Sequence, residues 1–544
     1  MPSPSSAHWL SLVGSIWLQT VNGPNADFPV YSSQLKELKH ITQVQLNFLA
    51  FASDAGKLFG WFSGVAALYL PLWLVAFVGA AFGLVGYGVQ YLFLDSAGLR
   101  YWHLFLLTSL AGNGICWINT VCYLLCMRNF GSSSRVAVSL ATSYLGLSAK
   151  VYTSLADSVP GLVASGSKAK TYLLLNAAVP MLVAVAVAPS LRVVQLRSEA
   201  STESDAAFLV MFAITLATGA CAVVGSIGST SGSGGLSSRE HVISLGVLLA
   251  TPVLIPLALR VRESLNKIRA TKRENRIHDL GADDDAGAGA GVVVDVGGAG
   301  PESKEGEGDG GVSEKPREEI GGLRLLRKLD FWLYFFSYMF SGTLGLVFLN
   351  NLGQIAESRR LGQTSTLVSL SSSFGFFGRL LPSFLDYYSA KSGYSISRTG
   401  SMASLMAPMA GAFFLLLNSS DFFLYLSTAV IGTCTGAIAS VAVSATSELF
   451  GAENFGVNHN VVVSNIPVGS LCFGYLAAYL YQRAAGGSSS HQCIGAACYR
   501  DTFAVWGATC AVGTLLCAVL YARGRRRRAA PPGEVIRTAR ASPA

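Results

Sequence analysis

Apolar residues fall along this chain in long blocks that alternate with short polar intervals. Each block is about 20 residues long, the length of a helix that crosses the hydrocarbon core of a bilayer. The short alternating strands of a membrane barrel do not occur. The pattern predicts eight membrane-spanning helices, a long polar interval and then six more. The expected spans are 9–31, 45–67, 69–93, 101–127, 136–157, 171–190, 206–228 and 241–260 before the interval, and 330–352, 366–387, 399–418, 421–446, 459–481 and 502–522 after it.

The polar interval differs from both flanking parts in composition. It begins with the basic run RVRESLNKIRATKRENR and continues with Gly, Ala and acidic residues, without a single aromatic residue. Such a stretch cannot bury enough apolar surface to offset its chain entropy, so we expect it to be disordered. The expected organisation is a first six-helix half (1–205), two additional helices (206–260), a disordered cytoplasmic linker (261–328), a second six-helix half (329–522) and a basic cytoplasmic tail (523–544).

Composition and charge support a membrane protein and argue against nucleic-acid binding. Hydrophobic residues make up 51% of the chain and charged residues 13%, against about 25% charged residues in soluble domains. The net charge of +8 arises largely from Arg260 to Arg276 and Arg523 to Arg528, both of which directly follow apolar spans. Basic residues at these positions indicate cytoplasmic anchoring. We therefore expect a multi-pass protein with both termini in the cytoplasm, and favour the plasma membrane over an internal one.

Ionisable residues inside apolar spans are candidates for function, because a charge in the bilayer needs a partner or a cavity. Asp54 and Lys57 share one helix face and can neutralise each other; alternatively, Asp54 takes up a co-transported proton. Lys150 lies deep in the fifth span. Its anion would be Asp54 across the bundle or a bound carboxylate substrate, and the structural alternatives are a permanent ion pair or a lysine that reaches the interface.

Two further pairs attract attention by their positions. Asn350 and Asn351 place adjacent amides at the end of the span 330–352, where they can bond to polar cargo or to another helix. Cys493 and Cys498 lie in a polar loop on the expected outer side. They form either a disulfide, which would persist there, or two free thiols.

Several long motifs resemble the nodulin-like plant branch of the major facilitator superfamily. The resemblance covers both halves, leaving out the linker and the tail. The motifs that carry it are HWLSLVGSIWLQTVNG from His8, NTVCYLLCMRNF from Asn119 with the following SSSRVAVSLATSYLGLSAKVYT, LRKLDFWLYFFSYMFSGTLGLVFLNNLGQIAES, FGFFGRLLPSFLDYY and SELFGAENFGVNHN.

The resemblance implies an all-α transmembrane fold of the major facilitator type, with two bundles of six helices around a central cavity. The chain would have 12 core helices and 2 extra ones between the halves, peripheral to the transport core. Arg379 and Asp386 would be cytoplasmic gate residues that pair in one access state and separate in the other; alternatively, Arg379 is a simple cytoplasmic anchor. The loop near Ser63 to Pro71 lacks basic residues, so the first half cannot form the usual charge clamp.

The expected function is therefore a secondary carrier that moves a small polar or anionic solute by alternating access. The alternative is a transporter-derived membrane sensor without net flux. No phosphate-binding loop, GxSxG or HExxH motif occurs, so we expect no enzyme activity, no cofactor and no metal site. The expected partners are a small-molecule solute, such as a carboxylate, a co-transported proton and the lipid bilayer.

Overall fold

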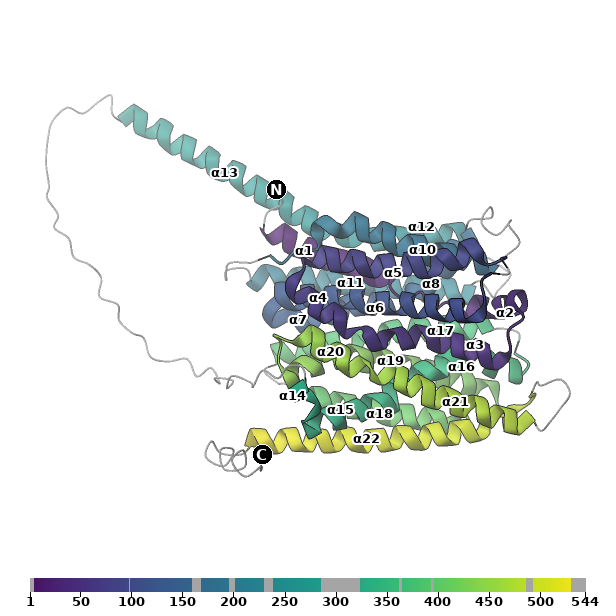
Figure 1. Ribbon diagram of the computed structural model, residues 1–544. Coiled ribbons are helices and arrows are strands. Elements are labelled where there is room, and N and C mark those ends of the chain that lie inside the picture. Colours follow the sequence, from purple (N-terminus) through teal and green to yellow (C-terminus); the bar gives the residue numbers. More distant parts are fainter. Residues whose placement is uncertain are drawn as a thin grey trace.

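The computed structural model describes residues 4–96, 98–158, 168–194, 201–228, 238–284, 323–361, 364–392, 396–485 and 493–529. Within these ranges the chain is almost entirely helical and contains no strand. Long helices lie side by side in one barrel-shaped helical bundle, which we call the barrel, with the first half above the second in the view of Figure 1. The start of α1, the end of α22 and the projecting helix α13 lie at one end of the barrel, which we call the linker end. We call the opposite end, where Cys493 and Cys498 form a disulfide, the disulfide end.

The first half consists of helices that are repeatedly broken within the barrel. The first break, between α1 and α2, contains Pro24, which has no N–H to donate. α3 begins with a capping box in which the Thr42 hydroxyl and the Gln45 side chain satisfy each other's backbone N–H. The elements are α1 (Pro4–Val21), α2 (Phe28–Lys39), α3 (Gln43–Gly56), η1 (Lys57–Phe59), α4 (Trp61–Tyr69), α5 (Leu72–Phe93), α6 (Tyr101–Phe130), η2 (Gly131–Ser133), α7 (Ser134–Leu145), α8 (Ser148–Ser158), α10 (Lys168–Val187) and η3 (Ala188–Ser190).

The second half has the same arrangement of long helices side by side. Its first long helix contains a π-helical turn, η5, between α15 and α16. The elements are α14 (Leu323–Leu326), α15 (Leu329–Tyr338), η5 (Met339–Thr343), α16 (Leu344–Ser358), α17 (Thr364–Lys391), α18 (Arg398–Leu415), α19 (Asp421–Phe450), α20 (Phe455–Val463), α21 (Asn465–Ala485), η6 (Ala496–Tyr499) and α22 (Arg500–Ala529).

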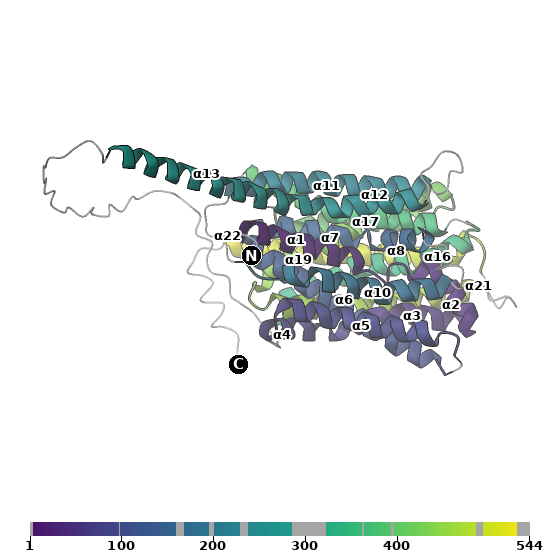
Figure 2. The same cartoon turned by 90° about the horizontal axis from the view of Figure 1, so that it is seen from above.

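The segment between the halves forms α11 (Ser201–Gly228), α12 (Ser238–Ala250), η4 (Thr251–Val253) and α13 (Leu254–Asp284). These helices lie on the outside of the barrel (Figure 2) but contact both halves. Phe208 of α11 packs against Trp9 of the first half, and Phe212 packs against Phe384 and Tyr387 of the second half. The inserted helices therefore bridge the halves along one side.

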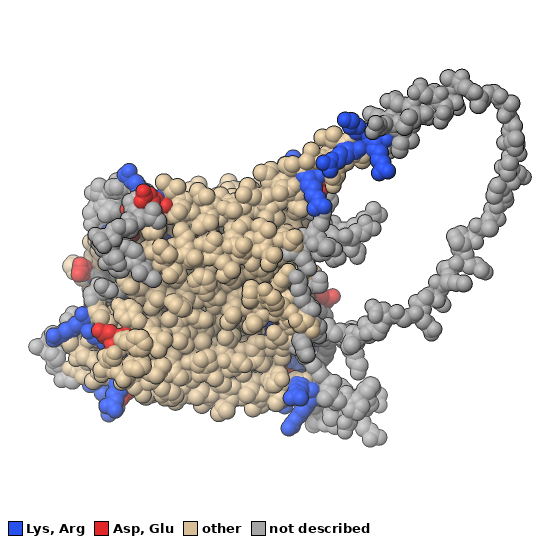
Figure 3. Space-filling model, turned by 180° about the vertical axis from the view of Figure 1, so that it is seen from behind, with Lys and Arg blue, Asp and Glu red and all other residues tan. Residues whose placement is uncertain are grey.

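Nine helical segments in the described part of the chain are long and apolar enough to cross a membrane. They correspond to nine of the fourteen expected spans. The other five, formed by α1 with α2, α3 with α4, α7 with α8, α17 and α18, are broken or more polar, yet lie within the same barrel. Charged side chains gather at the two ends of the barrel and leave a wide uncharged belt between them (Figure 3). This distribution is that of a multi-pass membrane protein.

The expected disorder of residues 261–328 is wrong for its first part. α13 continues as a helix to Asp284 and projects beyond the barrel. Its Arg, Lys, Glu, Leu and Ala residues are strong helix formers, so the helix of the preceding span is prolonged. The remainder up to residue 322 lies outside the described residues.

Candidate functional site

The two halves meet along a seam, formed by α3, α4, α7 and α8 on one side and by α17, α19, α20 and α21 on the other. At the linker end a Cβ atom on Gly64 would lie 2.4 Å from the carbonyl carbon of Gly456, so the backbones of α4 and α20 touch. Beside them the Asn460 amide donates to the hydroxyls of Ser63, at 3.3 Å, and Thr120, at 2.9 Å. Glycine packing and neutral hydrogen bonds thus hold the seam where the first half lacks a charge clamp.

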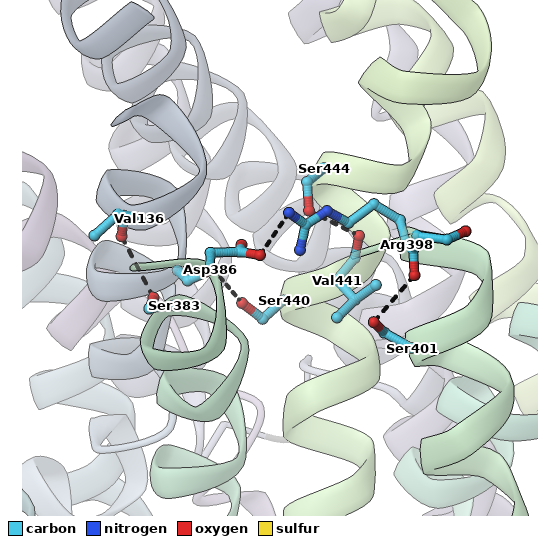
Figure 4. A network of polar contacts seen from close by, with 10 residues as sticks. Val136, Ser383, Asp386, Arg398, Ser401, Ser440, Val441 and Ser444 are labelled. Atoms are coloured by element: carbon cyan, nitrogen blue, oxygen red, sulfur yellow. Dashed lines mark hydrogen bonds and ion pairs between the residues drawn. The ribbon is translucent and has the colours of Figure 1, made fainter. Parts of the chain in front are cut away.

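Two more hydrogen bonds cross the seam near the linker end. The Ser440 hydroxyl of α19 donates to the Ser139 hydroxyl of α7 at 2.9 Å. The Ser383 hydroxyl of α17 donates to the Val136 carbonyl of α7 at 3.4 Å (Figure 4). All of these contacts are between uncharged groups.

Asp386 and Arg398 form a buried ion pair inside the second half. Arg398 Nη2 lies 2.5 Å from Asp386 Oδ1, and the two side chains are 4% and 8% exposed. Figure 4 shows them pointing toward each other from α18 and α17. Arg379 does not contribute to this pair, because it lies two turns away along α17, about 10 Å at 1.5 Å per residue. The proposed gating role of Arg379 and Asp386 stays a prediction.

Arg379 lies near the middle of α17, within the seam. Its Nη1 donates to the Gly375 carbonyl of the preceding turn at 3.5 Å, which is the one hydrogen bond of this guanidinium to a described residue. The ionisable groups near enough to act on its charge are Tyr123 of α6 and Tyr338 of α15, and no described carboxylate is among them. A Cβ on Gly146 of the first half would lie 3.0 Å from Nη1. Arg379 is thus a cation between the two halves without a described counter-charge.

Asp54 and Lys57 lie near the middle of the seam, where α3 ends before α4 begins. Lys57 Nζ donates to Asp54 Oδ1 at 2.6 Å, and both residues are buried, so the expected pairing is confirmed. The Ser470 hydroxyl of α21 donates to Asp54 Oδ2 at 2.6 Å and connects the pair to the second half. A role of the pair in substrate binding or proton coupling stays a prediction.

Closer to the disulfide end, amides join the halves. The Gln354 amide of α16 donates to Asn47 of α3 at 2.6 Å, and the Tyr499 hydroxyl donates to Gln354 at 2.9 Å. Asn350 and Asn351 line a cavity of about 120 Å³ between α3, α16 and α21. The Asn351 amide donates to a carbonyl of its own helix at 2.8 Å. Contact of either amide with cargo stays a prediction.

Lys150 reaches the inserted helices. Its Nζ donates at 3.1 Å to the carbonyl of Gly225, near the end of α11, where helix carbonyls lack intrahelical partners and attract cations. Of the two anions expected for Lys150, Asp54 is excluded in this structure, because Asp54 is bound by Lys57 and Ser470. A bound carboxylate remains a prediction.

Lys150 also lines a polar cavity of about 200 Å³, which we call the α8–α17 cavity. Charged and hydroxyl side chains from α8, α10, α12 and α17 contribute to its wall. They include Asp157, Lys168, His241, Thr366, Ser369 and Ser372.

Cys493 and Cys498 form a disulfide between α21 and α22. The backbone N–H of Gly495, within this loop, donates to the Ser358 carbonyl at the end of α16 at 2.8 Å. The alternative of two free thiols does not hold in this structure. The loop fastens the disulfide end of the second half.

Asp27 is a buried acid outside the set of candidate residues predicted from the sequence. It lies in the break between α1 and α2 and is 0% exposed. The Asn176 amide donates to Asp27 Oδ1 at 3.2 Å, while Oδ2 has no hydrogen-bond partner in the described part of the protein. The signal was an acid after a Gly-Pro pair inside an apolar span. The seam glycines and Asn460 have no comparable signal, because close packing of two backbones does not alter the pattern of hydrophobic and polar residues.

Metal chemistry finds no support in this geometry. Within the described ranges no three His, Cys, Asp or Glu residues lie close enough together to hold a metal ion. The seam offers hydrogen bonding by amides and hydroxyls, together with the charges of Arg379, Asp54, Lys57 and Lys150. Arg135 of α7 and Glu448 of α19 add two further charges, in a cavity between the halves.

Comparisons with known proteins place both halves in one family. The family model described as Nodulin-like matches residues 8–257, and the model described as NFD4, C-terminal domain, matches residues 316–529. Protein NUCLEAR FUSION DEFECTIVE 4 of Arabidopsis thaliana is 39% identical over 533 residues, which cover 95% of this chain and 88% of that protein. The probable transporter MCH1 of Yarrowia lipolytica (strain CLIB 122 / E 150) is 27% identical over 191 residues, 32% of this chain and 38% of that protein.

Solved structures share the fold at low sequence identity. A structure described for proton-dependent oligopeptide transporters matches 96% of this chain and 100% of its own, with 12% identity and a TM-score of 0.53. The proton:xylose symporter XylE of the major facilitator superfamily matches over 94% of this chain and 95% of its own, with 12% identity and a TM-score of 0.53. The fold is that of these transporters. From these matches over both halves, this chain belongs to the nodulin-like family, a plant branch of the major facilitator superfamily.

Proposed function

We propose that the protein is a secondary carrier that moves a small polar or anionic solute across a membrane by alternating access. The observation that carries this proposal is the polar character of the seam. Hydrogen bonds join the halves near the linker end, through Ser139 and Ser440, and near the disulfide end, through Asn47 and Gln354. These polar contacts interrupt an apolar cluster in which Phe376, Leu380 and Val443 pack against the first half. Neutral hydrogen bonds can be exchanged for water as one end opens, without uncovering a bare charge.

The inserted helices fit the same proposal. Because α11 contacts both halves through Phe208 and Phe212, it covers one side of the seam along its length. Opening would then occur at the two ends of the barrel and not sideways toward lipid. In our proposal the linker end faces the cytoplasm, because the basic residues of α13 and the end of α22 lie there.

A cross-link across the seam tests alternating access directly. Ser139→Cys with Ser440→Cys places two thiols where the hydroxyl oxygens are 2.9 Å apart. We expect oxidation to abolish solute flux in reconstituted vesicles and reduction to restore it, because the linker end could no longer open. Each single cysteine variant, treated in the same way, is the control. An imposed pH gradient in the same vesicles tests the proton as the coupling ion, which the descriptions of two structural relatives favour.

The outcomes separate the carrier from the sensor. Flux that continues unchanged in the oxidised double variant would contradict alternating access at this seam. Saturable binding without flux across a broad panel of solutes would support the alternative, a transporter-derived sensor. The panel begins with small carboxylates and sugars, together with their uncharged analogues.

A further inference from the structure

Arg379 is a partly exposed cation at the seam that has no counter-charge among the described residues. It lies roughly midway along α17, about 20 Å from either end at 1.5 Å per residue. Its one hydrogen bond to a described residue, at 3.5 Å to its own helix, is weak. A guanidinium in the hydrocarbon region persists when an anion or a water-filled cavity compensates its charge. Of the carboxylates near the seam, Asp54 and Asp386 already have their own cations. Glu448 lines a cavity together with Arg135, and Asp157 lines one together with Lys150.

We propose that Arg379 binds the carboxylate of a small monoanionic solute between Tyr123 and Tyr338. This inference rests on the proposed carrier function and names its substrate class and central cation. Arg379 thereby receives a role other than the gate contact that the resemblance implied.

The surroundings of Arg379 come from both halves. Tyr123 belongs to α6 of the first half, and Tyr338 directly precedes the π-helical turn η5 of the second half; such turns are frequent at functional sites. Gly146 of the first half packs directly against the guanidinium and the Phe376 backbone, because its Cβ would lie 3.0 Å from Nη1 and 2.9 Å from Phe376 Cα. An anion bound here would contact both halves at once, as a solute that is exposed alternately to the two sides must.

The chemistry of these groups favours a monocarboxylate. The planar guanidinium offers two parallel N–H donors that match the two oxygens of a carboxylate. The phenol hydroxyls of Tyr123 and Tyr338 can each donate one more hydrogen bond. Arg379 alone supplies a single positive charge, which a monoanion neutralises. A doubly charged phosphate would leave a buried negative charge without a partner.

A polar cavity lies on the disulfide-end side of Arg379. Thr366, Ser369 and Ser372 of α17 line this α8–α17 cavity at helical spacing. The same helix face continues through the buried Phe376, which packs against Tyr144, to Arg379. On the facing helix α8, Lys150 lines the same cavity and adds a second positive charge.

The test is a binding measurement on the full-length purified protein, read as the ligand-induced shift in thermal unfolding. The probes are acetate, lactate and benzoate, with acetamide, lactamide and benzamide as neutral matches and inorganic phosphate as the dianionic probe. We expect at least one carboxylate, but not its amide, to stabilise the protein. Arg379→Gln should weaken that binding about 10- to 100-fold, and Arg379→Lys should weaken it less. Arg500→Gln, the same change at an exposed arginine, should leave it unaltered.

Three results would overturn the proposal. The first is a carboxylate affinity that is unchanged in Arg379→Gln. The second is that no carboxylate of the panel stabilises the wild-type protein, or that only phosphate does. The third is an Arg379→Gln protein whose unfolding temperature without ligand falls as far as that of Asp386→Asn, which would make Arg379 a structural residue. The assay needs no gradient, so Arg379-dependent binding without vesicle flux refutes the carrier and leaves the site standing. If a neutral solute is transported and its flux is unchanged by Arg379→Gln, the carrier function stands and the carboxylate site is refuted.

Discussion

Arg398 and Arg379 belong to neighbouring parts of the second half, and both are surrounded by helices. Arg398, at the start of α18, lies 2.5 Å from Asp386 and is sealed inside the half. Arg379, at mid-length of α17, has phenols and a glycine around it and no carboxylate among the described residues. The same side chain thus has a carboxylate partner in one region and none among the described residues in the other.

The difference indicates which of the two arginines serves stability. A buried ion pair is not especially stabilising in itself, but removal of one partner leaves a bare charge in a low dielectric. Arg398 should therefore be needed for folding, and Arg379 should not. Substitutions that add or remove the partner of one arginine test this assignment.

The largest effect is expected from Asp386→Asn. The amide preserves the shape of the side chain but leaves Arg398 buried without a counter-charge, which destabilises by about 3–5 kcal/mol. The measurement is the free energy of unfolding in detergent or nanodiscs. The double variant Asp386→Asn with Arg398→Gln should recover much of the loss, because no charge remains. A single variant as stable as the wild type would show that the pair does not hold α17 to α18.

Gly375→Asp should convert Arg379 into a paired arginine. A Cβ at this position would lie 3.5 Å from Arg379 Nη1 and 3.5 Å from the Gly432 carbonyl, so a side chain fits, one turn before the guanidinium. We expect carboxylate affinity to fall about tenfold or more. The change of helix propensity should add only a few tenths of a kcal/mol of stability, because Asp is little better than Gly inside a helix.

Gly375→Ala is the control for that change, since it also adds a Cβ at this position but brings no charge; it should add about 1 kcal/mol of stability. Its carboxylate affinity should stay close to that of the wild type. If Gly375→Asp binds carboxylates as tightly as Gly375→Ala does, Arg379 is not the binding cation.

The fold was largely predictable from the sequence, because the length of apolar blocks directly reflects bilayer thickness. The positions of all fourteen expected spans are helical in the structure. The boundaries of the linker were less accessible. The basic run after Arg260 looked like the start of a disordered segment, yet it continues the helix of the preceding span to Asp284. The part of α13 from Val261 to Arg273 is largely exposed, so local helix propensity accounts for its helix.

The candidate site was only partly predictable, because partners are set by tertiary contacts. Asp54 and Lys57 are close in sequence, and their pairing could be deduced from helix geometry. The Asp386 partner is Arg398, across a loop, and the carbonyl that binds Lys150 lies on an inserted helix. Neither contact follows from residue spacing along one helix.

Asp27→Asn is the matched counterpart of Asp386→Asn and should have the smallest effect. Asp27 is fully buried, receives one hydrogen bond from Asn176 and has no described cation beside it. An ionised carboxylate is too costly in such a place, so the group is best accommodated as the neutral acid. An amide then replaces a neutral group of similar shape, and the free energy of unfolding should change by less than about 1 kcal/mol. A loss as large as that of Asp386→Asn would mean that Asp27 is ionised and held by a cation, and that buried charge in the first half is compensated as it is around Arg398.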